Sequence, residues 1–197
     1  NIPLRGYSFV APVQHVPAGE PVLIQTVQNA QNNLPARLTS VIGRDSIVGS
    51  LVRQLPVRRL TTLVGPGGIG KTTVALRVAE LLLQHYQDGV WWIDLGGIDD
   101  PARVLDHLRR TLELDVGAPL DGWAQRHALL VLDNCEHLLE RCRTLVDGLL
   151  IAAPRLSILV TSREPLLAAG EALVRLPSLA VPPDCERQSV AQVKGYS

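Results

Sequence analysis

The stretch that decides the fold is GPGGIGKTT, residues 65–73, directly after the short apolar run LTTLV at 60–64. Glycine and proline fill five of its first six positions, and a lysine and two threonines follow. Four residues satisfy the phosphate-loop pattern G-x-x-x-x-G-K-[ST], namely Gly65, Gly70, Lys71 and Thr72. The apolar run predicts a buried strand, and the residues after the loop have the apolar spacing of a helix. The loop therefore stands in the strand–loop–helix context that the pattern requires.

The residues of this loop have separable roles in holding a nucleotide's phosphates. The glycines let the loop curl so that backbone N–H groups point at phosphate oxygens, and the N-terminus of the following helix adds its dipole. Lys71 is expected to reach the β- and γ-phosphates, and the Thr72 hydroxyl to ligate Mg²⁺. We therefore expect ATP or ADP with Mg²⁺ rather than a glycine-rich turn without a ligand. The predicted nucleotide-binding residues of the loop are Gly65, Pro66, Gly67, Gly68, Ile69, Gly70, Lys71, Thr72 and Thr73.

A phosphate loop also needs an acid on the metal side, at the end of a strand beside the phosphates. Asp133 closes the apolar run of LLVLDN, residues 129–134. Because an uncompensated carboxylate is costly to bury, we expect Asp133 at the carboxyl end of its strand, facing a cation. Thr72 and Asp133 are thus the predicted metal ligands. The alternative is a carboxylate that caps the segment after the strand.

An arginine closes the next predicted strand, in TSR at 161–163. A guanidinium at the same edge can sense the γ-phosphate through charge-assisted hydrogen bonds, which makes Arg163 a candidate catalytic residue. The alternative is a surface arginine in a loop. Trp91 and Trp92, in VWWIDL at 90–95, are expected to pack in the core rather than to stack on a base.

Strand and helix patterns alternate along the chain. The strands are expected at 60–64, 90–95, 128–133, 156–161 and 172–176. The helices are expected after an N-cap at Asp45 or Ser46, from near Gly70, at 101–112 and at 137–152. Continuous apolar strands between helices predict an α/β fold, a parallel five-stranded sheet sandwiched by helices. One strand–helix unit separates the loop from Asp133, which indicates the ASCE division of P-loop NTPases.

Composition excludes several classes of protein. The chain of 197 residues has 19 basic and 19 acidic side chains, so no global basic field recruits nucleic acid. No apolar run is long enough for a membrane span, and we expect a soluble, cytoplasmic protein. Three cysteines at no metal-ligand spacing argue against a disulfide framework, and Cys142 falls on the apolar face of a predicted helix. The absence of Met and the start at Asn1 predict a piece of a longer protein.

With these residues assembled, the chain resembles the nucleotide-binding domain of the STAND class of signal-transduction ATPases. More narrowly, it is similar to the NB-ARC-like module of bacterial transcriptional regulators that join a winged helix to an ATPase. The resemblance covers about residues 33–183. It rests on NLPARLTSVIGRD (33–45), LVGPGGIGKTTVALRVA (63–79), DGVWWIDL (88–95), LLVLDNCEHLL (129–139) and ILVTSREPL (158–166).

The resemblance implies further site residues and further domains. Ile42, Gly43 and Arg44 lie where the family brings the chain to the adenine and ribose, and Arg163 lies where it keeps a sensor arginine. LRGYSFVAPV at 4–13 is similar to the last strand of an OmpR-type winged helix. The implied division is 1–13 a winged-helix remnant, 14–38 a linker, 39–183 the P-loop domain and 184–197 the lead-in to a helical domain.

The sequence leaves two main alternatives for the function. In the first, ATP and ADP states act as a switch that controls DNA binding by the winged helix of a parent regulator. In the alternative, the domain is a turnover NTPase, such as a motor or a kinase-like enzyme; a weakly binding P-loop scaffold is a third reading. The resemblance favours the switch, a slow Mg²⁺-dependent ATPase with nucleotide and DNA as partners, no membrane, and room for oligomerisation on activation.

The residue after the metal-side aspartate predicts the slow rate. In this P-loop division a carboxylate at that position often polarises the attacking water, but here it is Asn134. An amide orients water and cannot accept its proton at neutral pH. Glu136 is the nearest substitute, and the alternative is that Asn134 merely caps the following helix while another acid performs the chemistry.

Overall fold

The computed structural model describes residues 31–36, 41–114 and 120–179. The predicted winged-helix remnant at 1–13 and the lead-in at 184–197 lie outside the described residues, as does most of the predicted linker. Within the described part, no helix is long and apolar enough to cross a membrane.

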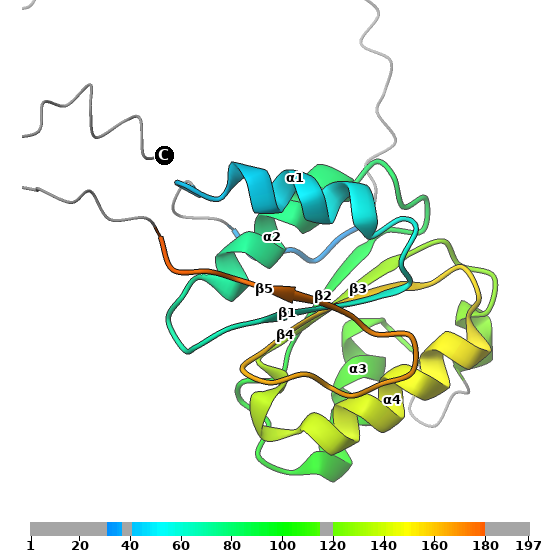
Figure 1. Cartoon of the computed structure of the whole chain (residues 1–197). Coiled ribbons are helices and arrows are strands. Elements are labelled where there is room, and N and C mark those ends of the chain that lie inside the picture. Colours follow the sequence, from blue (N-terminus) through cyan, green and yellow to red (C-terminus); the bar gives the residue numbers. More distant parts are fainter. Residues whose placement is uncertain (1–30, 37–40, 115–119, 180–197) are drawn as a thin grey trace, which may run out of the picture.

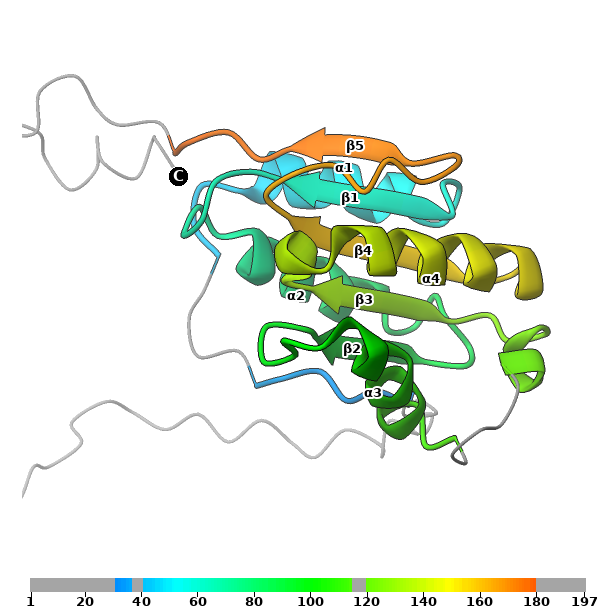
Figure 2. The ribbon, with the colours of Figure 1, turned by 90° about the horizontal axis from the view of Figure 1, so that it is seen from below.

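Five parallel strands form one sheet, in the spatial order β2-β3-β4-β1-β5 (Figure 2). Their bounds are Leu60–Val64 for β1, Val90–Asp94 for β2, Leu129–Asp133 for β3, Ser157–Ser162 for β4 and Ala172–Arg175 for β5. The strand that precedes the phosphate loop, β1, is separated from the strand that carries the acid, β3, by β4. The predicted α/β fold and the ASCE-type strand arrangement are therefore confirmed.

Helices cover both faces of the sheet (Figure 1). On one face lie α1 (Asp45–Gln54) and α2 (Lys71–Leu82); on the other lie α3 (Val104–Thr111) and α4 (Leu139–Ala152). Three short 3₁₀ turns complete the elements of the described segments, at Pro101–Arg103, Leu120–Trp123 and Cys135–His137. All five strands end at the same edge, where the phosphate loop leaves β1 (Figure 2).

Two hydrophobic clusters form the core, one under each helical layer. Successive strand residues alternate between them: Leu129 and Val131 pack toward α1 and α2, whereas Leu130 and Leu132 pack toward α3 and α4. Burial of each large apolar side chain contributes about 1.5–3 kcal/mol before entropy costs. Cys142 is fully buried in the cluster that faces α3 and α4, as predicted. The predicted packing role of Trp91 and Trp92 is also confirmed, because both side chains contact these clusters.

Helix starts differ from the predictions by one to three residues. The prediction that Asp45 or Ser46 caps the first helix is wrong, because α1 begins at Asp45 and Arg44 is its N-cap residue. Asp45 instead lies in the first turn, where a negative charge is favourable. The helix expected from 101 opens as a 3₁₀ turn, which the Asp100 carboxylate caps by accepting from the Ala102 N–H at 2.9 Å.

The described part of the predicted linker, residues 31–36, follows the free edge of β2. The Val90 N–H donates to the Gln31 carbonyl at 3.0 Å, and Asn32 forms a parallel bridge with Val90. The Asn33 side chain then pairs with the backbone of Trp92. This segment therefore covers unpaired backbone groups at an edge strand.

Candidate nucleotide-binding site

The phosphate loop connects β1 to α2 at the carboxyl edge of the sheet. Gly70 has φ +97°, a left-handed conformation that L side chains rarely adopt, and it is the N-cap residue of α2. In the described structure no side chain caps this helix, so the first N–H groups of α2 remain available to an anion. The predicted helix start near Gly70 is confirmed.

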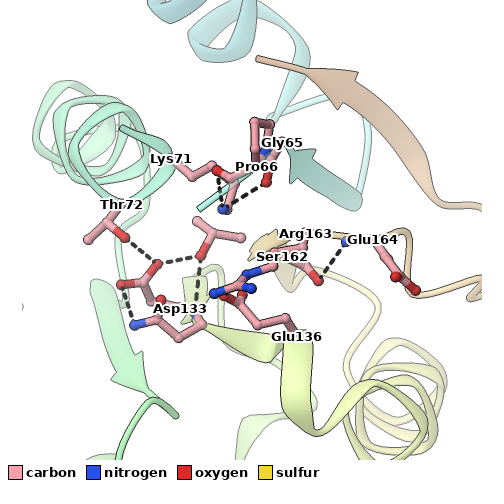
Figure 3. A network of polar contacts seen from close by, with 11 residues as sticks. Gly65, Pro66, Lys71, Thr72, Asp133, Glu136, Ser162, Arg163 and Glu164 are labelled. Atoms are coloured by element: carbon pink, nitrogen blue, oxygen red, sulfur yellow. Dashed lines mark hydrogen bonds and ion pairs between the residues drawn. The ribbon is translucent and has the colours of Figure 1, made fainter. Parts of the chain in front are cut away.

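Lys71 points back over the loop (Figure 3). Its Nζ donates to the carbonyls of Gly65 at 2.9 Å and Pro66 at 3.1 Å, and only 7% of the residue is exposed. The two carbonyls satisfy part of the ammonium's hydrogen-bonding capacity. A phosphate in the loop would lie beside a cation that is already held in place.

Thr72 and Asp133 come together from α2 and the end of β3 (Figure 3). The Thr72 hydroxyl donates to Asp133 Oδ1 at 3.0 Å, and the Thr161 hydroxyl of β4 donates to the same oxygen. Asp133 is only 2% exposed. A carboxylate and a hydroxyl oxygen in contact are hard ligands of the kind that Mg²⁺ prefers, so the residues present fit the predicted ion.

Burial raises the pKa of the Asp133 carboxyl above its usual value. Hydrogen bonds from Thr161 and Thr72 oppose this shift, and the neighbouring charge of Asp94 adds to it. The ionised form of this carboxylate is therefore costly to bury. A bound cation would lower that cost, which agrees with a metal-ligating role.

Asn134 has a left-handed backbone, φ +62° and ψ +46°, directly after β3. Its Nδ2 donates to Asp94 Oδ1 at 3.2 Å and to Asp133 Oδ2 at 3.4 Å. The residue occupies the N-cap position of the following 3₁₀ turn, but its side chain makes no capping hydrogen bond. The alternative that the Asn134 side chain caps the following turn is therefore wrong.

Arg163 follows β4 and lies beside the phosphate loop. A Cβ atom on Gly67 would be 3.4 Å from its Nη2, and its Nε donates to Glu136 Oε1 at 3.1 Å (Figure 3). The side chain is 63% exposed. Next to this pair lies an open cavity of about 600 Å³, lined by Gly96, Asn134, Glu136, His137, Arg163 and Glu164.

Of the three residues expected near the adenine and ribose, Arg44 contacts the phosphate loop. Arg44 is 7% exposed, and its guanidinium donates to the carbonyls of Pro177 and, at 3.3 Å, of Ile69. Gly43 has a left-handed backbone, and the Ile42 side chain is exposed. Arg44 thus joins the start of the domain, the phosphate loop and the segment after β5.

Sequence reasoning overlooked Asp94 and Thr161 at this site. Asp94 ends an apolar strand just as Asp133 does, and the two residues are paired in the β2–β3 register. The signal that singled out Asp133 was therefore present at Asp94. Thr161 has no such signal, because a threonine at the end of a buried strand is common in any parallel sheet.

Sequence comparisons relate the chain to segments of longer proteins. An uncharacterized protein of Mycobacterium tuberculosis is 34% identical over 171 residues, which cover 83% of this chain and 44% of that protein. A protein of the same species described as a candidate HTH-type transcriptional regulator is 39% identical over 145 residues, covering 64% of this chain and 15% of the regulator. Regulatory protein AfsR of Streptomyces griseus is 34% identical over 167 residues, covering 73% of this chain and 16% of AfsR.

Solved structures resemble the fold at low sequence identity. A signal transduction ATPase with numerous domains and a tetratricopeptide repeat sensor, from Pyrococcus horikoshii, gives a TM-score of 0.48 and 14% identity over 75% of this chain and 25% of that chain. The replication initiator DnaA bound to AMPPCP and single-stranded DNA gives 0.43 and 16% over 70% of this chain and 47% of that chain. No protein-family model matches the sequence.

Proposed function

We propose that this domain is an ATP/ADP-binding switch with slow, Mg²⁺-dependent hydrolysis. The observation that carries the proposal is the assembled phosphate site, in which Lys71 lies over the loop and Thr72 contacts Asp133 at 3.0 Å. The unpaired N-terminus of α2 adds donors for phosphate oxygens. These groups come from separate elements, so their convergence supports a common ligand.

The same site supports slow turnover rather than rapid catalysis. The position after Asp133 carries an amide, which cannot accept a proton at neutral pH. Glu136, the substitute that the sequence offers, is paired with Arg163. A general base typically contributes about 10²–10⁴-fold to a rate, so we expect turnover below the usual range of about 1–10³ s⁻¹.

The relatives support a regulatory setting. Two of them are named as regulators, and the matched segments form only 15% and 16% of their lengths. We therefore propose that the domain belongs to a STAND-type transcriptional regulator with an NB-ARC-like module, in which the nucleotide state controls DNA binding. Ile42, Gly43 and Arg44 would hold the base and ribose, and Arg163 would sense the γ-phosphate.

Nucleotide binding that depends on Lys71 tests this proposal. At a ligand concentration near 100 times Kd, binding adds about 2.7 kcal/mol. For a domain of this size, that raises the melting temperature by roughly 5–10 °C. The Lys71→Ala variant is expected to lose most of the shift, whereas Arg77→Ala, which removes a cation from the same helix, is expected to keep it.

Two results would contradict the proposal. Melting of the wild-type protein that is unmoved by ATP or ADP with Mg²⁺ would show that the site does not bind nucleotide. Single-turnover hydrolysis above about 1 s⁻¹ without a partner would show an enzyme built for turnover instead of a switch.

A further inference from the structure

Asp94 and Asn134 form an acid–amide pair at the edge of the nucleotide site. Asp94 is the last residue of β2, and the β2–β3 register places it opposite Asp133. Asn134 follows β3, and its Nδ2 lies 3.2 Å from Asp94 Oδ1 and 3.4 Å from Asp133 Oδ2. One amide nitrogen therefore has a carboxylate for each of its two hydrogens.

The two carboxylates determine which way the amide faces. Ionised carboxylates only accept hydrogen bonds, so the nitrogen of Asn134, and not its oxygen, must face them. The contact with Asp94 is the shorter of the two. The amide oxygen consequently faces away from both acids, and Asn134 is one of the residues that line the cavity beside Glu136 and Arg163. An oxygen in that place can accept a hydrogen bond from a water molecule.

The surrounding backbone is shaped around this contact. The Gly96 N–H donates to Asp94 Oδ1 at 2.8 Å. A Cβ atom on Gly96 would lie 3.1 Å from that oxygen and 3.2 Å from Asn134 Nδ2, closer than most side chains tolerate. The Asn134 N–H donates to the Thr161 hydroxyl at 3.1 Å, so its backbone is held as well as its side chain.

We propose that Asp94 is a positioning residue for nucleotide hydrolysis, which orients the Asn134 amide so that its oxygen holds the attacking water. This inference rests on the proposed function. The water oxygen forms a bond to the γ-phosphorus while the bond to the β–γ bridging oxygen breaks. The electron pair of that bond leaves on the nucleoside diphosphate, and the proton of the water passes to a γ-phosphate oxygen. The amide orients the water without taking its proton, which keeps the reaction slow.

Two pairs of variants separate this role from a purely structural one. Asp94→Ala removes the anchor, and Asp99→Ala removes an exposed acid from the loop that follows β2. Gly96→Ala pushes the pair apart, and Gly97→Ala adds the same methyl group where nothing lies within 4 Å. We expect single-turnover hydrolysis to fall by about 10–100-fold in the first variant of each pair, the range that misplacement of a reacting group causes. Affinity for a non-hydrolysable ATP analogue is expected to stay within about threefold.

Exchanging the two side chains provides a rescue. Asp94→Asn alone puts two amides together and leaves Asp133 as the one carboxylate that orients the Asn134 amide, whereas Asp94→Asn combined with Asn134→Asp restores an acid–amide contact with unchanged net charge. The double variant is expected to hydrolyse ATP faster than Asp94→Asn alone, because the acid–amide contact is restored and a carboxylate then faces the water. Melting temperatures measured beside the rates control for folding.

The outcomes also distinguish this inference from the proposed function. Equal hydrolysis by Asp94→Ala and Asp99→Ala, with nucleotide affinity intact, would overturn the positioning role alone. Failure of the double variant to recover above Asp94→Asn would also overturn it. Loss of nucleotide binding by the wild-type protein would instead overturn the proposed function.

Discussion

The side chain of Asn33 pairs with the backbone of Trp92 as a neighbouring strand would. Its Nδ2 donates to the Trp92 carbonyl at 2.8 Å, and its Oδ1 accepts from the Trp92 N–H at 2.6 Å. These are two backbone groups on the free edge of β2, whose other edge pairs with β3. Residues 59 positions apart in the sequence thereby close one edge of the sheet.

Removal of this pair is expected to destabilise the domain. Asn33→Ala leaves both Trp92 backbone groups without their partners, at a cost of about 1–3 kcal/mol. The melting temperature should fall by roughly 2–4 °C for each kcal/mol, as measured by calorimetry. Asn33→Asp keeps the acceptor for the Trp92 N–H but places a second acceptor against the Trp92 carbonyl, so a loss of similar size is expected. Unchanged melting of both variants would mean that the segment does not hold this edge.

The Asn33 contact also marks a limit of prediction from sequence. The strands and α2 were predictable because continuous apolar runs and a glycine-rich loop leave few alternatives to a parallel sheet. The register between a polar linker and an edge strand is set by tertiary contacts that no local periodicity records. Asp94 is a different case, since it had the same strand-end signal as Asp133 and was overlooked.

The Asp133 carboxylate is expected to lower stability when no cation is bound. Because burial raises its folded-state pKa above the unfolded value, the folded protein holds a proton that the unfolded chain releases. The free energy of unfolding therefore falls as the pH rises through the interval between the two pKa values, and stays lower above it. Asp133→Asn removes this charge and keeps an acceptor for Thr72 and Thr161.

Melting without nucleotide or divalent cations measures this effect. At pH 7 we expect Asp133→Asn to melt above the wild type, with the difference shrinking as the pH falls toward about 4, near the unfolded pKa. The same variant is expected to lose the additional stabilisation that Mg²⁺ gives in the presence of ATP. A variant that melts below the wild type at pH 7 would contradict the cost assigned to the ionised carboxylate.

Arg44 is expected to stabilise the phosphate loop as well as the fold. Its buried guanidinium donates to the carbonyls of Ile69 and Pro177, which belong to segments on either side of it. Hydrogen bonds to charged groups contribute about 1.5–3 kcal/mol, so Arg44→Ala should lower the free energy of unfolding by about that amount. Because Ile69 is part of the loop, nucleotide affinity should fall as well.

A conservative variant and a matched control sharpen this test. Arg44→Lys keeps the charge but offers no planar fork, so we expect it to behave more like Arg44→Ala than like the wild type. Arg53→Ala removes an exposed arginine from the last turn of the same helix. Equal nucleotide affinity in the Arg44 and Arg53 variants would separate Arg44 from the nucleotide site.

The pairing of Arg163 with Glu136 is expected to weaken discrimination between ATP and ADP. A γ-phosphate would share the positive charge of the Arg163 guanidinium with Glu136, and that contact exists only with ATP. Arg163→Ala should therefore weaken the affinity for ATP more than the affinity for ADP. Glu136→Gln removes the competing charge and should raise the affinity for ATP relative to that for ADP. The Arg163 side chain is 63% exposed, so the pair is worth at most about 1 kcal/mol, or roughly a fivefold change in the ratio of affinities.

Titrations of each variant with ADP and with a non-hydrolysable ATP analogue measure that ratio. Arg143→Ala, which removes an exposed arginine from α4, is the control for lost positive charge. The ratio of ATP to ADP affinity is expected to fall in Arg163→Ala and to rise in Glu136→Gln. This contrast is decisive, since a general loss of stability would weaken the binding of both nucleotides in both variants. A shift in the same direction for the two variants would exclude competition between Glu136 and the γ-phosphate for the Arg163 guanidinium.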